Sequence, residues 1–208
     1  MTICLVTDRR LRPPIEQASD AVAAGVDIIQ VRERDLEAGA LSALVAAIVA
    51  VTRGSATRVV VNDRVDVALA SGADGVHLRG DSMPAARVRP VAPLGFLICS
   101  AVHNVGEAAV AAGASDYLIA GTVFPTASKP GMTGLLGLDG LAGIARAVSV
   151  PVLAIGGMSV ARAADVARTG AQGLAAISLF ADPDRPIKDV VRQIRERFNM
   201  SGDLRPQP

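Results

Sequence analysis

Residues 59–78 read VVVNDRVDVALASGADGVHL, and this stretch contains one complete unit of the pattern that runs through the chain. A short β-branched run at Val59–Val61 is followed by a segment of helical period at Val65–Ala70, and a second apolar run follows at Gly75–Leu78. Gly72 comes directly after the helical segment, where a glycine able to adopt positive φ ends a helix. The stretch therefore predicts a strand, a helix and a second strand parallel to the first.

The same alternation of a short apolar run and a longer Ala-rich segment recurs eight times along the chain. Most of the predicted strands are apolar on both faces, which is typical of strands buried in a parallel sheet. Eight evenly spaced units of about 26 residues favour a closed (β/α)8 TIM barrel in the α/β class over the alternative, an open doubly wound sheet. We expect the strands at Ile3–Thr7, Ile28–Val31, Val59–Val61, Gly75–Leu78, Leu97–Ser100, Tyr117–Ala120, Val152–Ile155 and Leu174–Ser178. We expect the helices at Ile15–Ala24, Leu41–Arg53, Val65–Ala70, Ala85–Val88, Val105–Ala112, Leu138–Ala147, Val160–Arg168 and Ile187–Phe198.

A weak internal repeat supports the phase of these units. Four pairs that begin with glycine each follow a predicted helix and precede a strand, where positive φ at the glycine is expected. The pairs are Gly25-Val26, Gly72-Ala73, Gly113-Ala114 and Gly170-Ala171. Asp27, Asp74 and Asp116 come just after such pairs, at the amino ends of strands. Because this end of a β/α barrel serves stability, we expect structural roles for the three aspartates.

Composition indicates one domain with its own core. The chain has 208 residues, of which 50% are hydrophobic, and a formal net charge of +1. We expect a single domain over residues 1–200 and a disordered tail at 201–208, because the tail lacks an apolar pattern. No apolar run reaches the ~20 residues that cross a bilayer, and the first residues lack a signal-peptide pattern. We therefore expect a cytoplasmic protein with no membrane partner.

Cysteine and aromatic usage exclude further classes. Cys4 and Cys99 both lie in apolar runs, which predicts buried reduced thiols and no disulfide or cysteine metal site. With 2% aromatic residues and a near-neutral charge, the chain lacks the basic surface and the stacking rings that nucleic-acid binding needs. We therefore expect small-molecule partners, and the sequence leaves open whether the chain forms a homo-oligomer.

Two arginines follow the second predicted strand. In a β/α barrel the reacting groups project from the carboxyl ends of the strands, so polar residues directly after each strand are the candidates. Period-2 alternation places Gln30, Arg32 and Arg34 on one side, and two guanidiniums on one side suit a polyanion. The alternative interpretation is that both arginines are surface charges beside Glu33 and Asp35.

The remaining strand ends add polar and small residues. They are Asn62 and Asp63 after the third strand, Ser100 after the fifth, Thr122, Thr126, Ala127, Ser128 and Lys129 after the sixth, Gly156 and Gly157 after the seventh, and Ile177 and Ser178 after the eighth. Hydroxyls and a lysine in a loop bounded by glycine and proline can wrap a phosphate. Glycines let backbone N–H groups approach an oxyanion, and the loops after strands seven and eight are the usual phosphate site of this fold. As alternatives, Gly156-Gly157 forms only a tight turn, and Asp63 is only a cap or an ion pair.

The two histidines differ in their surroundings. His77 lies within an apolar strand, which favours a hydrogen-bonded core residue over a base. His103 comes shortly after the fifth strand, and core and site roles are both open for it.

Six stretches, in this order, resemble the thiamine phosphate synthase and TenI superfamily, and the resemblance extends to about Phe198. They are Leu5-Val6-Thr7-Asp8, Ile29-Gln30-Val31-Arg32-Glu33, Val61-Asn62-Asp63-Arg64-Val65-Asp66-Val67-Ala68-Leu69-Ala70, Gly72-Ala73-Asp74-Gly75-Val76-His77-Leu78, Phe124-Pro125-Thr126-Ala127-Ser128-Lys129 and Ala154-Ile155-Gly156-Gly157. The resemblance implies condensation of an aminopyrimidine methyl diphosphate with a thiazole phosphate, which releases diphosphate and forms thiamine phosphate.

The resemblance also implies roles for individual residues. The pyrimidine diphosphate would be held by Gln30, Arg32, Arg34, Asn62, Ser100 and Lys129, with Asp63 on Mg²⁺. The thiazole phosphate would be held by Thr126, Ala127, Ser128, Gly157, Ile177 and Ser178. Diphosphate departure leaves a cation that the pyrimidine stabilises, so cationic side chains and a metal would neutralise the leaving group while the thiazole nitrogen attacks. No protein nucleophile is required for this reaction.

The chain departs from the synthase pattern at two positions. Arg34 stands where the family usually has lysine, which keeps the charge and changes the shape of the donor. Ser82 stands where the synthase usually has a second metal-binding aspartate, and Asp81 precedes it by one residue, so Asp81 binds a metal only if the loop shifts. The segment 79–83 and Val102-His103 are more similar to the TenI branch.

The TenI branch implies an alternative reaction. It contains thiazole tautomerases, which move protons on a thiazole carboxylate phosphate and need neither a diphosphate site nor a metal. Its members often have histidine where Thr122 stands, and His103 is a candidate for a displaced acid or base. A third hypothesis is a non-catalytic regulatory protein that binds thiazole phosphate or thiamine phosphate.

Overall fold

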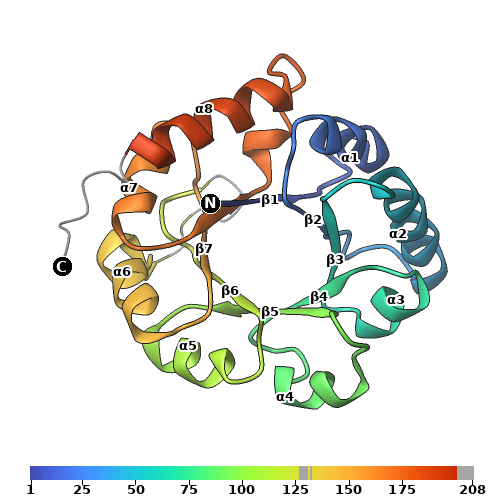
Figure 1. Cartoon of the computed structure of the whole chain (residues 1–208), viewed down its shortest axis with the longest axis horizontal. Helices are drawn as coiled ribbons and strands as arrows, with labels where there is room; N and C mark the ends of the chain where they lie inside the picture. The colour runs from blue at the N-terminus through green and yellow to red at the C-terminus, as the bar shows by residue number, and fades with distance from the viewer. Residues whose placement is uncertain (127–130, 132, 201–208) are drawn as a thin grey trace.

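Eight parallel strands form a closed barrel with the order β1-β2-β3-β4-β5-β6-β7-β8, and helices surround it as a ring (Figure 1). The computed structural model describes residues 1–126, 131 and 133–200. The strands are β1 (Thr2–Val6), β2 (Ile28–Val31), β3 (Arg58–Asn62), β4 (Gly75–Leu78), β5 (Leu97–Val102), β6 (Tyr117–Gly121), β7 (Val152–Ile155) and β8 (Gly173–Ala176). The helices are α1 (Pro14–Ala23), α2 (Ala38–Thr52), α3 (Val65–Ala70), α4 (Ala85–Val88), α5 (Val105–Ala112), α6 (Gly137–Ala147), α7 (Ala163–Arg168) and α8 (Ile187–Met200), with 3₁₀ turns η1 (Arg89–Val91) and η2 (Ser178–Phe180). The predicted (β/α)8 barrel is confirmed.

Alternation along each strand divides the apolar residues between two layers. One set faces the helices, and the other fills the barrel interior. The interior set consists of Cys4, Val6, Ile28, Val60, Cys99, Tyr117, Ile119, Leu153 and Ala175. Both cysteines are buried and free, as the sequence predicts, and burial raises the pKa of Cys4 to about 12. Within the described ranges, no helix has the length and apolarity needed to span a membrane.

The amino ends of the strands are tied together by carboxylates that accept backbone hydrogen bonds. Asp27 accepts from the N–H of Ile3 at 2.7 Å, Asp74 from Val59 at 2.8 Å, and Asp116 from Ile98 at 2.7 Å. At the corresponding place before β8, the side-chain oxygen of Gln172 accepts from Val152 at 2.8 Å. Each of these side chains supplies an acceptor to the strand that precedes its own, which confirms the structural role expected for the three aspartates.

Three local expectations are wrong. Gly113 has φ −65, because the chain leaves α5 with a further right-handed turn, whereas Gly25, Gly72 and Gly170 adopt positive φ as predicted. The last strand ends at Ala176 and not at Ser178, because Ser178–Phe180 forms η2. The helix expected from Val160 begins at Ala163. The predicted tail at 201–208 lies outside the described residues.

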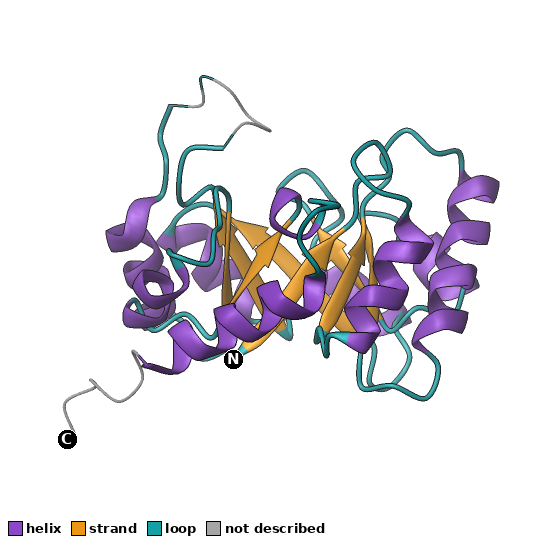
Figure 2. Cartoon of the chain, turned by 90° about the horizontal axis from the view of Figure 1, so that it is seen from above, coloured by secondary structure: helices purple, strands orange, loops and turns teal. Residues whose placement is uncertain are grey.

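All strands point toward one end of the barrel, as Figure 2 shows in side view. Loops from every strand therefore meet at that end, above the interior residues Val6, Ile119 and Ala175. This geometry gathers residues that are far apart in the sequence around one cavity.

We expect Asp116→Ala to lower the free energy of unfolding by about 1–3 kcal/mol, because it leaves the buried N–H of Ile98 without an acceptor. It also removes the ion pair with Arg89. Urea unfolding followed by circular dichroism measures the change. The control Asp189→Ala removes only an exposed pair with Arg192 on α8 and is expected to change stability little. Equal losses in the two variants would contradict the role assigned to Asp116.

Candidate active site

A cavity of about 900 Å³ opens at the carboxyl ends of the strands. Each of the eight strands, or the loop that follows it, contributes residues to its lining. Among the residues that the sequence singles out, the cavity brings together Gln30, Arg32, Arg34, Asn62, Asp81, His103, Thr122, Thr126, Gly156, Gly157, Ile177 and Ser178. These candidates therefore share one site, as the positions after the strands predict.

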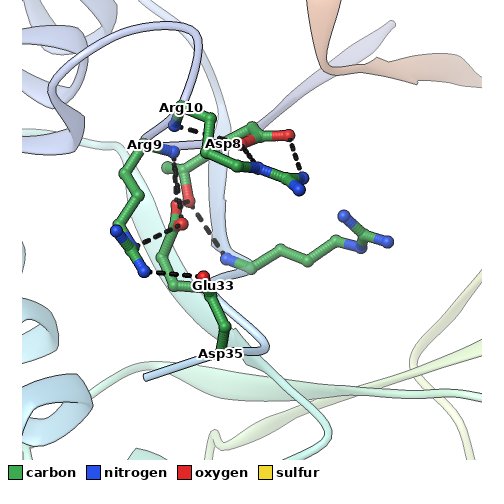
Figure 3. A network of polar contacts seen from close by, with 7 residues as sticks. Asp8, Arg9, Arg10, Glu33 and Asp35 are labelled. Carbon is green, nitrogen blue, oxygen red and sulfur yellow. Dashed lines mark hydrogen bonds and ion pairs between the residues drawn. The ribbon is translucent and has the colours of Figure 1, made fainter.

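A network between β1 and β2 fixes the loop on which the basic residues lie (Figure 3). The hydroxyl of Thr7 donates to the buried carboxylate of Glu33 at 2.6 Å and accepts from the backbone N–H of Arg32 at 3.0 Å. Glu33 also accepts from the backbone N–H of Arg9 at 3.2 Å. The Arg9 side chain pairs with Asp35 at 2.6 Å. The backbone that carries Arg32 is thus held at a defined position.

Arg32 and Arg34 reach the cavity and are not surface charges neutralised by Glu33 and Asp35, since those two carboxylates pair with Arg9. Neither Arg32 nor Arg34 forms an ion pair with any carboxylate in the described part of the chain. Burial of the Arg32 side chain, together with the nearby Arg34 guanidinium, lowers the pKa of Arg32. Two neighbouring guanidiniums that form no ion pair with a described carboxylate make a site suited to a polyanion.

Polar groups below the arginines face the same space. Gln30 and Asn62 are buried on β2 and β3 and line the cavity. The side-chain nitrogen of Gln30 is buried and has no hydrogen-bond partner among the described residues, so it is free to donate to a ligand. His77 also lines the cavity, and its Nδ1 lies 3.2 Å from the sulfur of Cys99. The expected hydrogen-bonded core histidine is confirmed, although it forms part of the cavity floor as well.

The opposite wall is built on glycine. Gly156 and Gly157 have φ 101 and φ 62, and a Cβ atom on Gly157 would clash with the carbonyl of Pro125 and lie 2.9 Å from Cβ of Phe124. Arg162 donates to the carbonyl of Gly157 and stacks over the Phe124 ring at 4.4 Å. In the described part of the chain, no backbone carbonyl accepts from the N–H of Gly157. The N–H of Gly157 thus lies at the cavity without a described backbone acceptor, which is the geometry that anion binding by a turn requires.

The other predicted residues of this wall fall into two groups. Thr122, Thr126, Ile177 and Ser178 line the cavity. Ala127, Ser128 and Lys129 lie outside the described residues.

The two predicted metal ligands, Asp63 and Asp81, lie at the rim with Arg79 between them. Arg79 pairs with Asp81 through Nε at 2.9 Å and through Nη2, and its Nη1 lies 3.5 Å from Asp63. The hydroxyl of Ser82 donates to the other oxygen of Asp63. In residues 1–126, 131 and 133–200, no group of three or more His, Cys, Asp or Glu side chains could hold a metal ion. The arrangement does not fit a Mg²⁺ ion between the two carboxylates, because the positively charged guanidinium of Arg79 already lies there.

His103 lies at the rim next to Glu107. Its Nδ1 is 2.9 Å from Glu107 Oε2, which also accepts the backbone N–H of His103 at 2.8 Å. Burial of the Glu107 carboxyl opposes its ionisation, but hydrogen bonds from His103 outweigh this and lower its pKa. A histidine oriented by a carboxylate at the mouth of a cavity has the geometry of a general acid or base.

Ser100 is the predicted site residue that the structure turns away. Its hydroxyl lies 2.8 Å from that of Ser115, and the cavity is lined by the next residue, Ala101. Since β5 continues to Val102, alternation from the interior residue Cys99 places Ala101 inward and Ser100 outward.

The sequence reasoning missed three charged residues of the cavity, Asp8, Arg10 and Arg79. Asp8 accepts two hydrogen bonds from Arg10, each at 2.8 Å, which hold its pKa below the ordinary value. Asp8 and Arg10 follow β1, and Arg79 follows β4. The rule that the polar residues after each strand form the site, applied also to these two strands, would have found them.

Comparison with known proteins gives consistent similarities. The family model described as thiamine monophosphate synthase, TMP-TENI, matches residues 3–180. The thiamine-phosphate synthase of Roseiflexus castenholzii is 41% identical over 201 residues, which cover 92% of this chain and 88% of that protein. The thiamine-phosphate synthase of Archaeoglobus fulgidus is 40% identical over 199 residues and 94% of each chain. The solved structure of a thiamine phosphate pyrophosphorylase from Pyrococcus furiosus matches with a TM-score of 0.86 and 33% identity over 96% of each chain.

We expect Gly157→Ala to weaken binding of inorganic phosphate by about 10-fold or more, because the added methyl group clashes with Pro125 and strains a positive φ. Isothermal titration calorimetry measures the affinity. The matched control Gly170→Ala also places a side chain at positive φ, 88, at the other end of the barrel, where an added Cβ makes only an ordinary contact with Ala145. It is expected to lower stability without changing phosphate affinity, and equal binding by both variants would refute the assignment.

We expect His77 to destabilise the fold as the pH falls. Burial, aided by the positive charge of Arg32, lowers its pKa from 6.5 to about 4. Between pH 6.5 and 4 the unfolded chain therefore binds more protons than the folded chain. As the pH is lowered through this range, the free energy of unfolding decreases by up to about 1.4 kcal/mol per pH unit. Denaturant titrations of wild type and His77→Gln at pH 7 and pH 5 test this. The wild type is expected to lose more stability than the variant, and parallel losses would contradict it.

Proposed function

The chain belongs to the thiamine monophosphate synthase family, and from this membership we propose that it condenses an aminopyrimidine methyl diphosphate with a thiazole phosphate to form thiamine phosphate. Diphosphate is the second product. The protein is thus a transferase of thiamine biosynthesis, a thiamine-phosphate diphosphorylase. The observation that carries the proposal is that two features face one cavity. They are the guanidinium cluster, Arg32 and Arg34, and the glycine cradle, the turn at Gly156 and Gly157.

The diphosphate end of the pyrimidine substrate is assigned to the β2 side of the cavity. Arg32 and Arg34 supply positive charge there, and neither forms an ion pair with a described carboxylate. When the C–O bond breaks, its electron pair leaves with the diphosphate, and these guanidiniums stabilise the developing negative charge. Gln30 and Asn62 lie deeper and orient the ring through hydrogen bonds, with the unpartnered amide nitrogen of Gln30 as a donor.

The thiazole phosphate is assigned to the wall across the cavity. Gly157 and Ser178 offer backbone N–H groups, and Ser178 and Thr122 add hydroxyls at the same face. With its phosphate held there, the thiazole nitrogen is directed toward the pyrimidine methylene carbon. A C–N bond forms from the nitrogen lone pair as the C–O bond breaks, so no proton has to be removed. The protein contributes position and charge, which are the main sources of rate in such a substitution.

The proposed reaction of this chain differs from that of the family in its need for a metal ion. Members of the family are generally Mg²⁺-dependent. In this chain the carboxylates of Asp63 and Asp81 are bound by Arg79 and Ser82, so no step of the proposed reaction is assigned to a resident ion.

A second candidate function rests on the His103–Glu107 pair. A histidine oriented by a carboxylate at the cavity mouth supports proton transfer on a thiazole carboxylate phosphate, the reaction of a TenI-type tautomerase. This reaction would use the same glycine cradle and leave the guanidinium cluster without a ligand. Loss of tautomerase rate in His103→Gln, with no thiamine phosphate formed from two substrates, would favour it over the synthase.

We expect the purified chain to form thiamine phosphate from the two phosphorylated precursors, with chromatographic detection of the product. Arg32→Ala is expected to lower kcat/KM by about 100-fold or more, because it removes charge that acts on the leaving group. Arg192→Ala, on the exposed face of α8, serves as the control and is expected to leave the rate unchanged. Absence of product at high enzyme concentration would refute the synthase, and tight binding of thiazole phosphate without turnover in either assay would indicate a regulatory binding protein.

A further inference from the structure

A four-residue turn at the rim of the cavity, Arg79 to Ser82, contacts the loop that follows β3. The backbone N–H of Arg79 donates to Ser82 Oγ at 2.7 Å, and Ser82 N–H donates back to the Arg79 carbonyl at 3.1 Å. Asp63 is held from the other side, since its own N–H donates to the His77 carbonyl at 2.8 Å. Its backbone adopts φ 67, which is uncommon for a residue with a side chain. The turn therefore brings Arg79, Asp81 and Asp63 together at fixed positions.

Every carboxylate oxygen of this group faces a hydrogen-bond donor or a guanidinium. Asp63 Oδ1 accepts from the Ser82 hydroxyl, and Asp63 Oδ2 faces Arg79 Nη1. Asp81 Oδ1 and Oδ2 accept from Nε and Nη2 of Arg79. A divalent ion between these carboxylates would have to displace the Arg79 guanidinium or lie against its positive charge. The guanidinium thus occupies the position between two carboxylates that a cation would need.

Arg79 keeps hydrogen-bonding capacity for a ligand. A guanidinium carries five N–H donors, and the contacts with Asp63 and Asp81 use three of them. The side chain lines the cavity together with Arg32 and Arg34. The three guanidiniums bound one region, because both Arg32 and Arg79 are near enough to His77 to act on its charge, and Arg34 acts on Asp81. An anion that enters this region would contact planar guanidinium donors from the loops after β2 and β4.

We propose that Arg79 acts as a built-in cation at this rim, so that a diphosphate group is bound by Arg32, Arg34 and Arg79 without a divalent ion. The inference rests on the proposed function in one respect, since it takes a diphosphate ester as the ligand. Arg79 is here a binding and specificity residue for the leaving group. In this arrangement the single charge of Arg79 lies between Asp63 and Asp81 and adds to the charges of Arg32 and Arg34 at the cavity.

The test titrates inorganic diphosphate into the full chain by calorimetry, once with EDTA and once with Mg²⁺ present. We expect binding in EDTA with an affinity that changes by less than about 3-fold when Mg²⁺ is added. We also expect no binding of Mn²⁺ alone to the wild type by electron paramagnetic resonance. Diphosphate binding seen only with Mg²⁺ would overturn the inference.

Variants at Arg79 separate charge from structure. Arg79→Gln is expected to weaken diphosphate binding in EDTA by about 10-fold or more and to bind Mn²⁺, because it releases the carboxylates of Asp63 and Asp81. Arg79→Lys keeps the charge and is expected to lose less affinity than the glutamine variant, which keeps the test valid if Arg79→Gln does not fold. The matched control Arg64→Gln removes a pair with Asp66 in the first turn of α3, outside the cavity, and leaves the affinity unchanged. Equal affinity of Arg79→Gln and wild type would refute the role of Arg79.

The condensation assay distinguishes this inference from the proposed function. Thiamine phosphate formed in EDTA supports both. Product formed only with Mg²⁺ would support the synthase and overturn the role of Arg79. Diphosphate binding in EDTA with no product under any condition would support the guanidinium site and refute the synthase.

Discussion

Closure of the parallel sheet between β1 and β8 is the constraint on which the site depends. The two strands pair with Thr2 opposite Gly173 and Leu5 opposite Ala176, and a Cβ atom on Gly173 would clash with the Thr2 carbonyl. Only glycine permits this approach. Because the sheet closes there, the loops after β1 and β2 face those after β7 and β8 across one cavity. In an open sheet, Arg32 and Gly157 would lie at different places along the sheet edge, and the cationic and glycine-rich walls would not oppose one another.

The two ends of the barrel use charge in opposite ways. At the amino ends, Asp27, Asp74 and Asp116 accept backbone N–H groups, and arginines from other elements neutralise them. These charged groups therefore stabilise the fold and are paired within it. At the carboxyl ends, the carboxylate next to Arg32 is Glu33, and Thr7 and Arg9 bind it. Binding Glu33 in this way leaves Arg32 available for a ligand, so the hydrogen bonds of Glu33 with Thr7 and Arg9 prepare the site (Figure 3).

The sequence predicts the fold and most of the site because both follow from periodicity. Strands with two apolar faces and helices that end at glycine are compatible with few architectures. In a β/α barrel, the positions at the strand ends then identify Gln30, Arg32 and Gly157 as site residues. Ser100 fails for a local reason. The sequence pattern predicts that the strand ends at Ser100, whereas the strand continues to Val102 and the inward position is Ala101. A shift of one residue reverses the face of the sheet to which a side chain points. Predictions of site residues therefore depend more on locating the end of a strand than on recognising that the strand exists.

The pairing of Arg79 could not be predicted from the sequence, since it depends on how one turn folds. The family resemblance implies an aspartate where Ser82 stands, but the sequence does not show that Ser82 and Arg79 both contact Asp63. The distinction matters physically. A divalent ion concentrates two charges at about 2 Å from its ligands, whereas a guanidinium spreads one charge over a plane of directed donors. Several guanidiniums are therefore needed to balance a diphosphate, and the clustering of Arg32, Arg34 and Arg79 around one cavity supplies them. Ser82 and Arg79 act together in this arrangement, since Ser82 binds both the backbone of Arg79 and the carboxylate of Asp63.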